Sequence, residues 1–251
     1  MITKHVTKSI CAFLLFPSLF FGQIDKEYKT SYVWFDNMIG REYTGLFNGK
    51  KYIDTDINKI FANRHPFFLS DKVLLGTIIY KGQTYYDIPL KYNLETDNLL
   101  VSLKSKSSTA ILELIKSNIS HFEIEGFEFR SLKNIGNTKE ITRGFYQIVY
   151  ENSDMTLYKK LKKNRKKRIE DLGGSKIYFE FIKEYTYILF YDSTYHVVKS
   201  KNDIIEIFPD TKQDVKLYYG NNKILKKTEP DSFMKGLFER IASESLLKND
   251  F

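Results

Sequence analysis

The densest group of chemically active side chains in the sequence is a basic run. The stretch from Leu157 to Arg168 reads LYKKLKKNRKKR and carries eight cations within ten residues. Cations at this density repel one another and resist burial, and Glu170 and Asp171 are the only acids close downstream. We therefore predict a solvent-exposed loop between two strands. The eight cations are Lys159, Lys160, Lys162, Lys163, Arg165, Lys166, Lys167 and Arg168.

Such a run attracts anionic surfaces. In the functional interpretation it binds lipopolysaccharide, phospholipid head groups or acidic glycans. In the alternative it is only a solvated loop. Nucleic acid is compatible with the charge, but no aromatic-rich RNA-binding motif adjoins the run, and we do not expect this partner. Binding should weaken as salt rises, and replacing four of the lysines with Gln should leave thermal stability nearly unchanged.

Oxygen-bearing side chains at alternate positions form a candidate metal motif. Asp54, Asp56 and Asn58 are spaced like the first ligands of a calcium-binding EF-hand loop. That loop also needs a Gly and a bidentate Glu, at the positions where this sequence has Lys59 and His65. We therefore predict a capped turn and no metal site.

No stretch completes a catalytic or cofactor-binding motif. Gly40 and Gly45 have the spacing of a phosphate-binding loop, but the Lys and Ser/Thr that must follow are missing. Asp192, Ser193 and His196 are close in sequence, whereas a hydrolytic triad is assembled in space, so we interpret them as polar turn residues. We predict no catalytic, cofactor-binding or metal-binding residue and no cofactor. A hydrolase whose site is built from distant residues stays an alternative.

The first 22 residues have the layout of an export signal. Basic residues precede an apolar stretch, Ile10–Phe21, and Gly22 supplies a small residue before the polar sequence that begins at Gln23. The apolar stretch is shorter than the roughly 20 residues that span a bilayer, so we expect cleavage after Gly22, with an uncleaved anchor as the alternative. We expect export to the periplasm or the outer envelope, or secretion.

The composition is that of a basic globular protein. Hydrophobic residues make up 42% of the 251-residue chain, which is enough for a buried core. Cleavage of the signal would remove Cys11, the only cysteine, and would lower the net charge from +8 to +6 by removing Lys4 and Lys8. The mature chain would then have neither a disulfide framework nor a thiol nucleophile.

The middle of the chain alternates apolar and polar residues, which indicates half-buried antiparallel strands. Val73–Tyr80 and Thr84–Leu90 flank Lys81, Gly82 and Gln83, which predict a three-residue hairpin loop. Further strands are expected near residues 99–103, 122–129, 146–150, 177–181 and 185–191, the last two separated by Lys183 and Glu184.

Beyond residue 200 the pattern becomes helical. Ser200 and Asp203 predict a capping box for a helix that ends before Pro209, and Asp210 with Gln213 repeats the pattern. Asp231 is expected to cap the last helix, which carries an apolar stripe that should pack on the sheet. The stripe consists of Phe233, Met234, Leu237, Phe238, Ile241 and Ala242.

These elements predict a mainly β fold: an antiparallel meander or a partly closed barrel-like sheet with C-terminal helices packed on it. No Pro- or Gly-rich linker divides the chain. We expect a signal peptide, residues 1–22, and a single β-rich domain, residues 23–251, whose helical segment covers about 200–251.

Several segments resemble a group of bacterial proteins. They are a mature start at Gln23, the stretch YDIPLKYNLETDNLLV (Tyr86–Val101), the basic LYKKLKK stretch and NDIIEIFPDTKQDVKLYY (Asn202–Tyr219). They are similar to stretches in uncharacterised β-rich secreted and envelope proteins of Bacteroidetes. The resemblance implies export and a layout of strands followed by helices, but no reaction and no site residues.

Export without a complete catalytic motif favours a non-enzymatic cell-envelope protein that binds or scaffolds. An outer-membrane β-barrel is an alternative, because the chain ends in Phe251 and its strands are aromatic. The alternation expected of a last barrel strand breaks at Asn249, and the residues before it read as a helix. The hydrolase is the second alternative, and the oligomeric state is left open.

Overall fold

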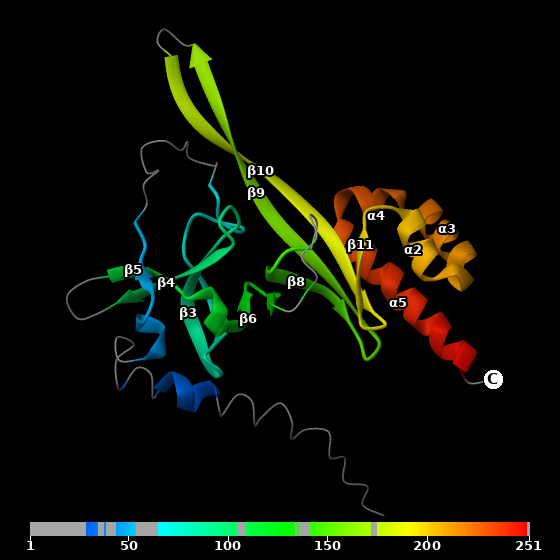
Figure 1. The fold of residues 1–251 in the computed structure, drawn as a ribbon, viewed down its shortest axis with the longest axis horizontal. Helices are drawn as coiled ribbons and strands as arrows, with labels where there is room; N and C mark the ends of the chain where they lie inside the picture. The colour runs from blue at the N-terminus through cyan, green and yellow to red at the C-terminus, as the bar shows by residue number, and fades with distance from the viewer. Residues whose placement is uncertain are drawn as a thin grey trace, which may run out of the picture.

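The computed structural model describes residues 29–34, 38, 44–53, 65–104, 109–133, 135, 141–171 and 175–249. In this part of the chain the fold is mainly β, with one eleven-stranded sheet and helices at the C-terminal end, as predicted (Figure 1). The predicted signal, residues 1–22, and the segment Asp54–Asn58 lie outside the described residues. Within the described residues, no helix has both the length and the hydropathy to cross a membrane.

The sheet and the helices have the following bounds. The strands are β1 (Lys50–Lys51), β2 (Leu74–Tyr80), β3 (Gln83–Asn93), β4 (Asn98–Lys104), β5 (Thr109–Glu113), β6 (Ile119–Ile124), β7 (Phe127–Leu132), β8 (Gly144–Glu151), β9 (Met155–Asp171), β10 (Ser175–Tyr191) and β11 (Thr194–Val198). The helices are α2 (Lys201–Ile207), α3 (Lys212–Asn221), α4 (Lys223–Thr228) and α5 (Pro230–Asn249), with short 3₁₀ turns η2 (Gly45–Phe47), η3 (Lys116–Asn118) and η4 (Pro209–Thr211).

The described strands form an open antiparallel meander with two departures from sequential order. Their order is β1-β5-β4-β3-β2-β6-β7-β8-β9-β10-β11, so β1 pairs with β5 and not with β2, and β6 returns through η3 to pair with β2. The first half of the sheet curls toward β9, so that the Lys163 amide donates to the Leu94 carbonyl oxygen at 3.2 Å. This curl brings Leu161 of β9 into the same apolar core as the strands of the first half.

The hairpins follow turn chemistry that the sequence carries locally. Lys81 and Gly82 form the turn between β2 and β3 with φ of 53° and 80°, the left-handed pair that a two-residue hairpin loop needs. Gln83 already belongs to β3, so the predicted three-residue loop is one residue too long. Glu125 and Gly126 repeat the same pair of φ angles, 51° and 77°, between β6 and β7.

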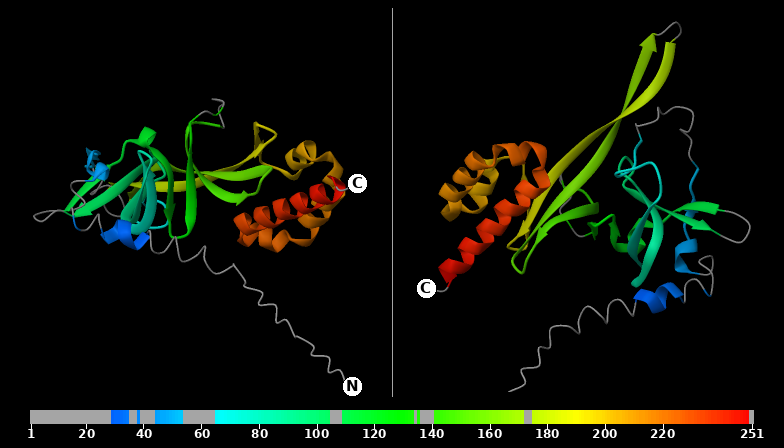
Figure 2. Two further views of the ribbon diagram at one scale, coloured as in Figure 1. Left: turned by 90° about the horizontal axis from the view of Figure 1, so that it is seen from below. Right: turned by 180° about the vertical axis from the view of Figure 1, so that it is seen from behind.

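Two large apolar cores lie along the sheet. The first is rich in aromatic rings: Phe122 and Phe129 stack at 4.7 Å, and Tyr92 and Phe145 meet them edge-on. The second lies between β9–β11 and the helices, which gather at one end of the sheet (Figure 2). Every residue of the predicted α5 stripe is buried, which confirms that this helix packs on the sheet.

The structure confirms the predicted N-terminal cap of α2 and differs from the predicted caps of α3 and α5. Ser200 and Asp203 form both halves of a capping box at α2, as expected. Asp210 lies inside η4, and the N-cap of α3 is Thr211, so the second predicted box is wrong. Asp231 is in the first turn of α5 and not at its cap, because Pro230 is the first helical residue.

The basic run is a strand and not a loop, which corrects the prediction. Lys159–Arg168 lies within β9, whose 17 residues pair in unbroken register with the 17 residues of β10. Because β10 is continuous, Lys183 and Glu184 are strand residues too, and the predicted break there is wrong. The β9–β10 hairpin projects well past the rest of the sheet (Figures 1 and 2).

Candidate functional site

The strand geometry of β9 sorts the basic run onto two faces, because successive side chains of a strand point to opposite sides. Lys162 and Lys166 pair in register with Glu184 and Glu180 of β10, so cations and acids share that face. On the other face, Lys163 pairs with Lys183 and Lys167 with Phe179, so no acid of the paired strands lies among these positions. The two faces therefore differ in net charge.

Lys159 is buried at the base of the hairpin. Its side chain is 6% exposed, and its ammonium donates to both carboxylate oxygens of Asp231 in α5, at 2.6 and 2.7 Å. The Tyr187 hydroxyl donates to the same carboxylate at 2.5 Å. Burial lowers the pKa of Lys159, although Asp231 opposes the shift. This ion pair fastens α5 to β9 and β10.

Lys160, on the opposite face, is held by Asp97 of the β3–β4 turn. Its ammonium lies 2.9 Å from Asp97 Oδ2 and donates to the Phe145 carbonyl oxygen at 3.0 Å. Asp97 also accepts from the Tyr92 hydroxyl at 2.5 Å and from the Lys116 ammonium. Burial lowers the pKa of Lys160 and raises that of Tyr92 well above its usual value.

Gly144 leaves room for this network, because a Cβ there would overlap Asp97 Oδ2 and the Lys160 ammonium. Its φ of 157° also lies in the range that residues with a side chain rarely adopt, so the backbone and the space both favour glycine at this position. The Asp97 network thus joins the first half of the sheet to β8 and β9.

Three further cations of the run also have partners. Lys163 donates to the carbonyl oxygens of His65 and Phe67 at 2.8 and 2.7 Å. Arg165 makes two hydrogen bonds to Glu95, at 2.7 and 2.8 Å. Arg168 binds Glu180 across the hairpin at 2.7 Å. Most of the acids that pair with the run are therefore distant from it in sequence, and Lys163 binds carbonyl oxygens in place of an acid.

Four lysines of the described part of the β9–β10 hairpin are exposed to solvent, and we call them the outer lysines. They make no ion pair with any residue in the described ranges. They are Lys162, Lys166 and Lys167 of β9 and Lys183 of β10. Of the eight cations predicted as a site, Lys159, Lys160 and Lys163 are structural, Arg165 and Arg168 are paired, and the remaining three are available to a partner.

Other candidate chemistry from the sequence does not converge. Asp192 and Ser193 form the β10–β11 turn with φ of 47° and 58°, as polar turn residues were expected to do. His196 belongs to β11 and pairs with Leu189, so its predicted place in the turn is wrong. The described residues contain no cluster of three His, Cys, Asp or Glu side chains suited to a metal ion.

A cavity that the sequence did not reveal lies beside the Lys159–Asp231 pair. It has a volume of about 350 Å³ and is bounded by β10, the end of β11 and helices α3–α5. Its aromatic walls include Tyr185, Tyr187, Tyr219 and Phe233. These residues come from separate elements, so no local motif could have indicated the cavity.

Comparison with protein families, with curated proteins and with solved structures finds no match to this chain. The functional assignment therefore depends on the described side chains themselves. The resemblance to Bacteroidetes envelope proteins stays a prediction.

The pKa of Lys163 gives a pH-dependent prediction. Burial, and secondarily the charge of Lys183, lower this pKa from 10.5 to about 8. Between these two pH values the unfolded chain holds the proton and the folded chain has lost it, so Lys163 should favour folding increasingly as pH rises. Relative to Lys163→Gln, the wild type should gain stability from about pH 8 to 10.5 in urea unfolding series. NMR titration of the lysine side chains should show Lys163 near 8; an ordinary Lys163 pKa would contradict this prediction.

Proposed function

We propose that this chain is an exported, non-enzymatic cell-envelope protein that attaches to a phosphate-bearing lipid surface through its β9–β10 hairpin. The outer lysines provide the contact. The rest of the sheet and the helices form the body that the hairpin holds at the surface. The observation that carries the proposal is a set of exposed lysines along a hairpin whose outer part, from Lys166 and Lys167 onward, extends past both cores (Figure 1).

The anchoring of the inner cations supports this function. Lys159, Lys160 and Lys163 bind groups from three other parts of the chain, so the base of the hairpin is fixed in place. A fixed base holds the outer lysines in a defined arrangement, which lowers the entropy lost on binding. A flexible solvated loop with the same charges would lose more conformational entropy on binding.

The side chains toward the tip favour lipid over glycan. Ile169 shares a face with Lys167 and is 61% exposed, and Phe179 lies opposite Lys167 in the register. Apolar groups beside lysines suit the boundary between head groups and acyl chains, where each gains a matching environment. Each lysine near an anionic membrane contributes about 1 kcal/mol, so the four outer lysines together would supply about 4 kcal/mol.

Vesicle co-sedimentation tests the proposal. The purified protein should bind vesicles that contain phosphatidylglycerol and not vesicles of phosphatidylcholine alone, and the bound fraction should fall as salt rises. Lipopolysaccharide micelles should compete for the protein, because they also present phosphates. Failure to bind either anionic lipid would refute the proposal. Tighter binding to a soluble acidic glycan than to the vesicles would replace the lipid by a glycan as the partner.

A further inference from the structure

We infer that the cavity between β10 and helices α3–α5 is a binding site for a small aromatic molecule that carries a phosphate or carboxylate group. This site lies at the base of the β9–β10 hairpin and uses none of the outer lysines, so it is independent of the proposed attachment to lipid. The inference combines the shape of the cavity, its aromatic walls and its charge.

The cavity has the size and position of a ligand site. Its volume of about 350 Å³ falls at the lower end of the range of roughly 300–1,000 Å³ that is typical of small-molecule pockets. It lies where the sheet meets the helices, so its walls come from both layers: Tyr185 and Tyr187 from β10, Tyr219 from α3, and Phe233 and Met234 from α5. Such convergence of separate elements on one space is the usual setting of a preformed pocket.

The walls offer rings to a flat ligand. Tyr185 is 46% exposed although it stands beside buried strand residues, and its ring meets that of Tyr187 at 5.5 Å with an angle of 70°. Tyr219 packs edge-on against Phe233 at 4.9 Å. Rings in offset or edge-on arrangements add about 0.5–1.5 kcal/mol per pair beyond the burial of area. An aromatic ring in the cavity can extend this arrangement, whereas a purely ionic ligand cannot.

The charge of the lining selects an anion. Lys226 of α4 lines the cavity with its ammonium 4.9 Å from the centre of the Tyr219 ring, and Lys199 lines it as well. None of the described lining residues is acidic. Asp231, just behind the wall, is already bound by Lys159 and Tyr187, so its charge is compensated. Burial, with Asp203 as a smaller cause, raises the pKa of Tyr219 to about 12, so its hydroxyl stays protonated at neutral pH.

Calorimetric titration with phenyl phosphate tests this inference. Phenol and inorganic phosphate, which correspond to the two halves of that molecule, are titrated for comparison. Phenyl phosphate should bind measurably more tightly than either half, because only the whole molecule meets both the rings and Lys226. Lys226→Gln should weaken phenyl phosphate binding about tenfold, the effect of losing one charge-assisted hydrogen bond. Tyr185→Leu should weaken the binding of phenyl phosphate but leave that of inorganic phosphate unchanged.

Lys227→Gln is the matched control, because Lys227 is an exposed lysine of the same helix that does not line the cavity. It should leave phenyl phosphate binding unchanged. Equal weakening by the two lysine variants, equal affinity for inorganic phosphate, or no binding of phenyl phosphate would overturn the inference. A variant that replaces the outer lysines of β9 should bind phenyl phosphate like the wild type, which separates this result from the test of lipid attachment.

Discussion

Replacing Asp97 with asparagine should lower the free energy of unfolding by about 3–5 kcal/mol, the usual cost of removing one partner of a buried ion pair. Asp97 is 18% exposed and Lys160 is 16% exposed, so little water replaces the lost charge. The Lys116 ammonium and the Tyr92 hydroxyl lose the same acceptor. Asparagine keeps the size of the side chain and tolerates the φ of 58°, so the change reports charge and hydrogen bonding and not backbone strain.

Urea unfolding measures this effect, and Asp192→Asn is the control. Asp192 also has a positive φ, 47°, but lies exposed in a turn, so its replacement should change stability by less than about 0.5 kcal/mol. Adding Lys160→Met to Asp97→Asn should restore part of the loss, because the uncompensated charge is then removed. Equal stability of the Asp97 and Asp192 variants would show that the Asp97 network does not stabilise the fold.

Asp231→Asn should cost about 2–3 kcal/mol, less than the Asp97 change because Asp231 is 35% exposed. The variant leaves the Lys159 ammonium, 6% exposed, without its counter-charge. The loss should concentrate at the contact between α5 and the sheet. Amide hydrogen exchange in α5 should therefore become faster, while exchange in the aromatic first core should change less.

Asp214→Asn is the matched control for this second change. Asp214 of α3 also pairs with a cation, Arg240 of α5, at 2.9 Å, and it is about as accessible as Asp231. Arg240, however, is 47% exposed where Lys159 is 6% exposed, so water can solvate the cation when the Asp214 carboxylate is removed. Its removal should cost no more than about 1 kcal/mol. If the Asp231 and Asp214 variants lose the same stability and show the same exchange rates in α5, the Lys159–Asp231 pair does not fasten the helix.

Local patterns predicted much of this fold. The α5 stripe and the capping box at Ser200 depend on spacing within a few residues, and both are present in the structure. The alternation of apolar and polar residues along the strands likewise indicates which face of the sheet is buried. The return of β6 to pair with β2 could not be predicted in this way, because no residue of either strand records which edge of the sheet it joins.

The basic run was misinterpreted because its partners are distant in sequence. Asp231 is 72 residues from Lys159, and Glu95 is 70 residues from Arg165, so a search for nearby acids could not find them. Leu157 and Leu161 were the available signal. Both are almost fully buried, at 0% and 3% exposed. Apolar residues four positions apart share one face of a strand or of a helix, so they favour a regular element with a buried face over a loop.

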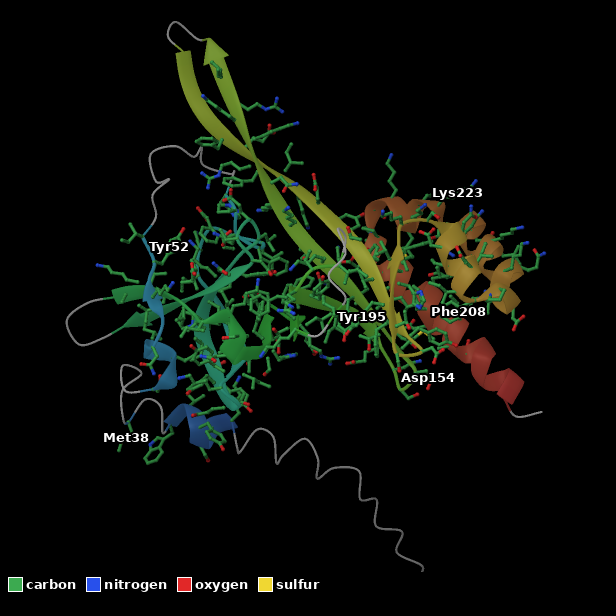
Figure 3. The ribbon with its side chains drawn as sticks, viewed as in Figure 1. Met38, Tyr52, Asp154, Tyr195, Phe208 and Lys223 are labelled. Atoms are coloured by element: carbon green, nitrogen blue, oxygen red, sulfur yellow. The ribbon has the colours of Figure 1, made fainter. Side chains whose placement is uncertain are left out.

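The proposed function requires that the position of the lysines on the hairpin, and not the total charge of the protein, determines binding to lipid. Two charge-matched triple variants separate these possibilities. The hairpin variant combines Lys162→Gln, Lys166→Gln and Lys167→Gln. The helix variant combines Lys212→Gln, Lys216→Gln and Lys223→Gln. All six lysines are exposed, and Lys223 lies at the outer surface of the helices (Figure 3). Both triple variants should fold like the wild type, since surface substitutions usually change stability by less than about 0.5 kcal/mol.

The deciding measurement is the affinity of these two variants for vesicles that contain phosphatidylglycerol. At about 1 kcal/mol per lysine, the hairpin variant should lose about 3 kcal/mol, a weakening of roughly a hundredfold, and most of its dependence on salt. The helix variant should bind nearly as the wild type does. Equal losses in the two variants would show that net charge alone attracts the protein to the membrane and would contradict a binding role for the β9–β10 hairpin.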